Sequence, residues 1–126
     1  MRAVDTNVLV RLVTRDQAKE TSAAEEFVAS GAWVSHLVLA EMAWVLDSVY
    51  RLDSTKIALA VDMLLNHMSL TMENPEVVEA ALARFRAWPK LGFSDCLIVE
   101  IARKAGHLPL GTFDKDLARV DGVTKL

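Results

Sequence analysis

The chain has 126 residues, 52% of them hydrophobic and 25% charged, and a formal net charge of −3 at pH 7. This length suits one domain with an ordinary buried core, so we predict a single domain over residues 1–126. The apolar fraction excludes a disordered chain, and the acidic balance excludes the uniformly basic surface that many nucleic-acid binders use.

The first half of the chain predicts strands that alternate with helices. Apolar residues recur at helical spacing in two segments, and polar residues that can cap a helix precede them. The third helix has apolar positions almost all round, which predicts deep burial. The expected elements are a strand at Arg2–Val4, a helix opened by Asp5-Thr6-Asn7, a helix at Gln17–Ala29 ended by Gly31, a strand at Ala32–Val34, and a helix at His36–Tyr50 capped by Ser35.

The second half continues the alternation. Asn74 and Pro75 form a strong helix start, because asparagine caps well and proline suits the first turn. The expected elements are a helix opened by Asp53-Ser54-Thr55, a strand at Leu70–Met72, a helix from Pro75 to before Pro89, a helix capped by Ser94 and ended by Gly106, a strand at Leu108–Leu110, a short helix at Asp114–Val120, and an edge strand at Val123–Thr124. This order predicts an α/β three-layer sandwich with a central, mostly parallel sheet.

Nothing in the sequence indicates a membrane or an oxidising compartment. The only cysteine, Cys96, has no partner in the chain for a disulfide. The longest strongly apolar stretch, Leu37 to Leu46, is too short to span a bilayer and contains Glu41. The residues before Asp5 form no signal-peptide core. We therefore expect a soluble, cytoplasmic protein.

Four acidic residues stand in apolar or turn-like surroundings: Asp5, Glu41, Asp95 and Asp114. Carboxylates in such surroundings are costly unless they are paired, hydrogen-bonded or neutralised by a cation. Asp5 and Asp114 each follow a predicted strand, and ligands of parallel α/β sheets gather at the carboxyl ends of strands. We therefore expect these two acids at one sheet edge, with Asp95 and Glu41 reaching the same crevice from their helices.

A cluster of oxygen ligands favours Mg²⁺ or Mn²⁺. Such a metal activates water and neutralises a phosphodiester, which would let an acidic protein cut an anionic polymer. For Asp5, Asp95 and Asp114 taken singly, a plain helix-capping role remains open. Glu41 lies inside a helix, so its alternatives are a buried ion pair or a partly exposed face. Asp116 fits a solvated first-turn residue, or a residue that assists Asp114.

The segments around these acids resemble the four motifs of the PIN-domain ribonucleases, and the whole chain is similar to a VapC-type toxin of a toxin-antitoxin pair. The order of the four segments over nearly the full length makes the resemblance specific. The matching segments are Val4-Asp5-Thr6-Asn7-Val8-Leu9, Leu39-Ala40-Glu41-Met42, Phe93-Ser94-Asp95-Cys96-Leu97-Ile98 and Leu110-Gly111-Thr112-Phe113-Asp114-Lys115-Asp116-Leu117.

The resemblance implies a PIN-like fold in which Asp5, Glu41, Asp95 and Asp114 hold Mg²⁺ or Mn²⁺ and position water for attack on an RNA phosphodiester. It also implies supporting roles for Asn7 and Thr112, whereas we expect Thr6 to cap the first helix. A homodimer and a VapB-like antitoxin are the implied partners. Glu100 stands where relatives often have a small residue, and we expect it to be exposed.

Several other residues have both a functional and a structural interpretation. Arg11 and Arg15 lie four apart and share a helix face, which suits RNA phosphates, an acidic partner or plain solvent. For Trp33, Trp44 and Trp88, core or interface packing is favoured over base stacking.

Two rival functions remain open at this point. The fold can serve as a non-catalytic binding module that acts only through its partner. An aspartate-nucleophile phosphatase would also place an aspartate after the first strand, but that chemistry normally needs a second acid where this chain has Asn7.

Overall fold

The central sheet of the computed structural model, which describes residues 1–126, contains three parallel strands in the order β1-β2-β3. β1 is Arg2–Ala3, β2 is Ala32–Val34 and β3 is Leu70–Met72. Each connection between these strands contains two helices, as parallel neighbours require a crossover. The predicted α/β fold with a central parallel sheet is therefore confirmed, and β2 and β3 have the predicted bounds.

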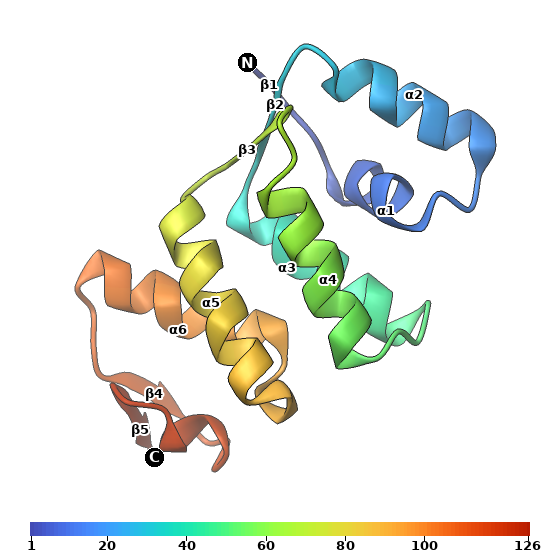
Figure 1. Ribbon diagram of the computed structural model, residues 1–126. Coiled ribbons are helices and arrows are strands. Elements are labelled where there is room, and N and C mark those ends of the chain that lie inside the picture. The colour runs from blue at the N-terminus through green and yellow to red at the C-terminus, as the bar shows by residue number, and fades with distance from the viewer.

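A second, two-stranded parallel sheet holds β4 (Leu110–Thr112) and β5 (Val123–Lys125). Figure 1 shows this pair near the C-terminus, at the opposite end of the molecule from β1. The expectation that the strands before Asp5 and Asp114 share one sheet edge is wrong. With only two residues, β1 offers a very short ladder, and its hydrogen-bonded neighbour is β2. β4 begins later than predicted because Pro109 has no N–H to donate.

Six α-helices and two 3₁₀ helices complete the chain. The predicted caps Asp5, Ser35, Asp53 and Asn74 all accept a backbone N–H at their helix starts. None of the helices is both long and apolar enough to cross a bilayer. The bounds are α1 Thr6–Thr14, α2 Ala18–Val28, α3 His36–Ser48, α4 Ser54–Leu65, α5 Pro75–Ala87, η1 Pro89–Leu91, α6 Phe93–Ala105 and η2 Leu117–Arg119.

Two predictions about helix ends are wrong. α6 is capped by Gly92, whose φ of +80° suits glycine, and Ser94 lies inside its first turn. The expected helix at Asp114–Val120 is only the short 3₁₀ turn η2, which Asp114 precedes. Gly106 does end α6 in the left-handed conformation, as predicted.

The core is one cluster of buried apolar side chains to which most helices contribute. Leu39 and Leu46 of α3 are fully buried, and burial of each such side chain contributes about 1.5–3 kcal/mol. The predicted deep burial of α3 holds for only one side of the helix. Leu37 is 68% exposed and Trp44 63% exposed, because nothing in the chain packs over them. Glu41 lies between these two residues in the sequence and is also exposed.

Candidate active site

Asp5 and Glu41 meet through the first turn of α1. The Asp5 carboxylate caps this helix by accepting the N–H of Val8 at 3.3 Å. The hydroxyl of Thr6 donates to Oε2 of Glu41 at 2.7 Å. The prediction that Thr6 caps α1 is therefore wrong, because Asp5 occupies the cap and leaves the Thr6 hydroxyl free to reach α3. Two of the four acids are thus next to Thr6: Asp5 precedes it in the chain, and Glu41 accepts its hydrogen bond.

Asp95 enters the same neighbourhood from α6. Its neighbour Ser94 donates from Oγ to the carbonyl of Ala40 at 3.4 Å, which places the start of α6 beside the turn of α3 that carries Glu41. Partial burial raises the pKa of Asp95, and the negative charge of Asp114 raises it further. Asp95 and Asp114 therefore form a second, mutually repelling pair.

Asp114 is held by its own loop after β4. Its N–H donates to the hydroxyl of Thr112 at 3.0 Å, and its Oδ1 accepts the N–H groups of Asp116 and Leu117 at 2.8 and 3.2 Å. These bonds occupy Oδ1 and leave Oδ2 without a hydrogen-bond partner. The side chain of Asp116 forms an ion pair with Lys90 at 3.4 Å. Thr112 and Asp116 thus lie where they can support Asp114.

The four acids do not form one preassembled cage. No three acidic, histidine or cysteine side chains lie close enough to hold one metal ion. The donor chemistry nevertheless fits a divalent cation, because all four acids supply oxygen and none forms an ion pair with a lysine or arginine. The donors therefore fit Mg²⁺ or Mn²⁺ in type, but they are arranged as two pairs.

The remaining predicted site residues are Asn7 and Arg11 on α1 and Arg15, which caps the C-terminal end of this helix. Asn7 lines a groove between α1 and α2 and has no hydrogen bond to any of the four acids. Arg11 is largely buried and held by Glu20, Asp16 and the Tyr50 hydroxyl. Arg15 is 57% exposed and pairs with Glu25 at 3.0 Å. Of the two arginines, Arg15 is therefore the more accessible.

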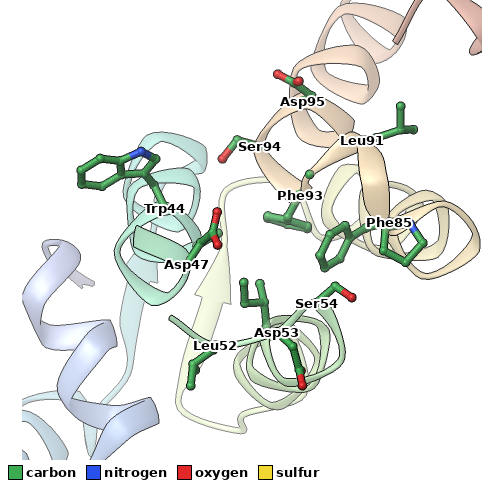
Figure 2. A pocket seen from close by; sticks show the side chains of 14 residues that line it. Trp44, Asp47, Leu52, Asp53, Ser54, Phe85, Leu91, Phe93, Ser94 and Asp95 are labelled. Atoms are coloured by element: carbon green, nitrogen blue, oxygen red, sulfur yellow. The ribbon is translucent and has the colours of Figure 1, made fainter. Parts of the chain in front are cut away.

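Sequence reasoning missed a pocket of about 360 Å³ that includes Asp95 in its wall. Figure 2 shows it between α3, α4 and the start of α6, with the Asp47 carboxylate directed toward Phe93 and Asp95 at the edge, directed away. Trp44 also lines it and is 63% exposed, so it does not pack in the core, and the alternative of packing at an interface stays a prediction. The position of Trp44, three residues beyond Glu41 and hence on the same side of the helix, was the available clue.

The expectation for Glu100 is also wrong. This residue is only 8% exposed, because α6 packs closely along α5 and covers its stem. Its carboxylate pairs with Arg103 at 3.4 Å, one turn further along α6. Glu100 is therefore explained by a partly buried ion pair and not by the acidic site.

Comparison with known proteins identifies one family. A search of curated proteins found no match. The family model described as the PIN domain matches residues 2–123, which is nearly the whole chain and includes all four acids. PIN domains are typically metal-dependent nucleases. The parallel α/β frame and the two carboxylate pairs agree with that match, and the chain belongs to the PIN-domain family.

Proposed function

We propose that this PIN-domain protein is a metal-dependent endoribonuclease that acts as the toxin of a toxin-antitoxin pair. The observation that carries the proposal is the set of four carboxylates, Asp5, Glu41, Asp95 and Asp114, which come from four segments and have no basic partner. Asp95 in particular is partly buried, where an acid without a basic partner is costly. Acids left unpaired on a nuclease fold suit a cation and an anionic substrate.

In this proposal the contacts of each acid determine its place in the metal site. Asp5 and Glu41, joined through Thr6, hold one side of the site, while Asp95 and Asp114 hold the other. Mg²⁺ or Mn²⁺, when bound by these side chains, would neutralise the phosphodiester and lower the pKa of water. Thr112 and the loop at Asp116 keep Asp114 in place.

The test is cleavage of single-stranded RNA by the purified chain with Mg²⁺ or Mn²⁺, with single-stranded DNA in parallel. We expect RNA cleavage that disappears in EDTA and in Asp5→Asn. Glu79→Gln is a matched control, because Glu79 is exposed on α5 and forms no ion pair. Cleavage that survives both EDTA and Asp5→Asn would refute the mechanism.

The toxin role needs a separate measurement. Expression of the chain should arrest growth of a bacterial host, and Asp5→Asn should relieve the arrest. A small neighbouring gene with a DNA-binding fold and a basic tail would be the candidate VapB-like antitoxin, and co-expression should restore growth. Sedimentation of the purified protein would test the proposed homodimer.

One observation favours a second candidate, a non-catalytic PIN-like binding module. The acids do not gather into a group that could hold a metal ion as they stand. Thermal unfolding with and without Mg²⁺ or Mn²⁺ separates the two functions, because a ligand that binds only the folded state raises the melting temperature. No shift with either metal, together with no cleavage, would favour the binding module. The phosphatase alternative has no structural observation in its favour.

A further inference from the structure

We propose that the pocket beside Asp95, lined on α3 by Trp44 and Asp47, binds a guanine base of the RNA substrate. The inference rests on the proposed ribonuclease function and gives it a base preference. Asp95 belongs both to the pocket wall and to the acidic site, so a base in the pocket would lie next to the phosphodiester held by the acids.

The size and lining of the pocket suit an aromatic ring. Its volume of about 360 Å³ lies within the range of small-ligand sites, roughly 300–1,000 Å³. Phe85 and Phe93 form an edge-to-face pair, with ring centroids 6.0 Å apart, in its wall. Leu52 and Leu91 add aliphatic surface. Such a lining can cover the apolar faces of a base, which form no hydrogen bonds, and shield them from water.

The charge of the pocket excludes an anion and favours a donor-rich ligand. No lysine or arginine lines it, whereas Asp47, Asp53 and Asp95 do. Asp53 already accepts the Lys56 N–H at 2.9 Å as the cap of α4. Asp47 has no hydrogen bond or ion pair within the chain, and Figure 2 shows its carboxylate directed into the pocket. Asp95 also has no hydrogen bond but is directed away from the pocket, so Asp47 is the free acceptor that faces a ligand.

A free carboxylate selects guanine among the four bases. Guanine presents two adjacent donors, N1–H and the N2 amino group, which match the two carboxylate oxygens. Adenine and cytosine place a ring acceptor beside their amino group, and uracil flanks its single N–H with carbonyl oxygens. Each of these acceptors would face the negative charge of Asp47.

Trp44 supplies a surface for stacking at the rim. It is 63% exposed, an unusual cost for an indole ring with no partner in the chain. Trp44 and Asp47 are three residues apart on α3 and both line the pocket, where the Trp44 ring is directed outward, away from the Asp47 carboxylate (Figure 2). Stacking on exposed aromatics is the common way in which proteins hold single-stranded bases.

A guanidinium group is the main competitor, because it also offers paired N–H donors to a carboxylate. Its positive charge and five donors suit the carboxylates of Asp47, Asp53 and Asp95, so its affinity must be measured beside that of guanosine. A neutral guanine ring needs only the two hydrogen bonds.

The test measures the binding of nucleosides to the metal-free protein in EDTA. The change in tryptophan fluorescence on binding is the readout. We expect guanosine to bind about tenfold more tightly than inosine, which lacks the N2 amino group, and than adenosine. Asp47→Asn should abolish this preference, and Glu79→Gln should keep it. Trp44→Phe should remove most of the fluorescence change, and circular dichroism confirms that each variant is folded.

Equal affinity for guanosine, inosine and adenosine would overturn the proposal, as would an unchanged preference in Asp47→Asn. Tighter binding of arginine amide than of guanosine would also overturn it and point to a protein partner. Cleavage of oligonucleotides that differ at one guanine gives the second readout. Cleavage without guanine preference refutes only this inference, and guanosine preference without cleavage refutes only the nuclease.

Discussion

The hydroxyl of Thr6 donates a hydrogen bond of 2.7 Å to Oε2 of Glu41 and so joins the start of α1 to the middle of α3. Asp5 caps the same helix, so this bond fixes the position of Glu41 relative to Asp5. The bond occupies one carboxylate oxygen and leaves Oε1 for another ligand. Thr6 is therefore a positioning residue for two of the four acids.

We expect Thr6→Val to lower metal affinity and RNA cleavage about tenfold, the usual effect of losing a group that orients a ligand. Valine keeps the shape of threonine but cannot donate to Glu41. Calorimetric titration with Mn²⁺ and the metal dependence of the cleavage rate would measure the loss. Thr6→Ser, which keeps the hydroxyl, should stay within about threefold of the original protein. An equal loss in both variants would contradict the positioning role.

The helix caps were predictable because capping is local. Asp5, Ser35, Asp53 and Asn74 each bond to an N–H three residues away, so a few residues of sequence contain the information. Ser94 shows the limit of this rule. Gly92, two residues earlier, adopts a backbone conformation that starts α6 sooner, and the Ser94 hydroxyl bonds to α3 instead.

The arrangement of the acids was only partly predictable, because it depends on contacts between distant segments. The sequence identified Asp5 and Asp114 as residues that follow strands, and both are. It did not reveal that β1 and β4 lie in separate sheets, since strand pairing is decided by the whole fold. The exposure of Trp44 and the burial of Glu100 likewise depend on which helix faces the packing leaves uncovered.

Asp95 should make the metal-free protein less stable at neutral pH. Burial and the charge of Asp114 raise the pKa of Asp95 in the folded state, so the folded state binds this proton more tightly than the unfolded state. The resulting stability is present at low pH and is lost as the pH rises through the raised pKa. Asp95→Asn should therefore raise the melting temperature in EDTA by about 1–3 °C at pH 7.

The same substitution should abolish cleavage while stabilising the fold, because it removes a proposed metal ligand. The gain should shrink as the pH falls through the raised pKa of Asp95 and should vanish below its ordinary pKa of 3.8, where Asp95 is protonated in both states. Asp114→Asn provides the control, since it removes the neighbouring charge and should also raise the melting temperature at pH 7. A lower melting temperature for both variants at pH 7 would contradict the proposed repulsion.

Cys96 should add an alkaline dependence to the stability. Burial raises the pKa of its thiol from 9.0 to about 11. Between these values the unfolded chain loses the thiol proton and the folded chain keeps it, so the free energy of unfolding falls as the pH rises. We expect Cys96 to account for a fall on the order of 2 kcal/mol. Urea unfolding at pH values equal to these two pKa values gives the fall in the free energy of unfolding, which should be smaller in Cys96→Ala than in the original protein. An equal fall in both proteins would exclude the thiol as the cause.

Arg11 lies on α1 and Arg15 caps the end of this helix in the left-handed conformation, so the two arginines should have different roles. Arg15 is 57% exposed and pairs with an equally exposed Glu25, so its ion pair is weak and a phosphate can replace it. Arg11 is largely buried and bonded to Glu20, Asp16 and Tyr50. It therefore joins α1 to α2 and to the segment after α3. We expect Arg15→Ala to weaken RNA binding without changing the melting temperature, and Arg11→Ala to lower the melting temperature.

The measurement is binding of a 2′-O-methyl RNA, which resists cleavage, over a range of salt concentrations. Loss of one phosphate contact should reduce the slope of log affinity against log salt by about one unit in Arg15→Ala. Lys19→Ala removes the same charge from an exposed site on α2 and should leave the slope nearly unchanged. Equal slope changes in Arg15→Ala and Lys19→Ala would mean that net charge alone governs binding and that Arg15 has no specific contact.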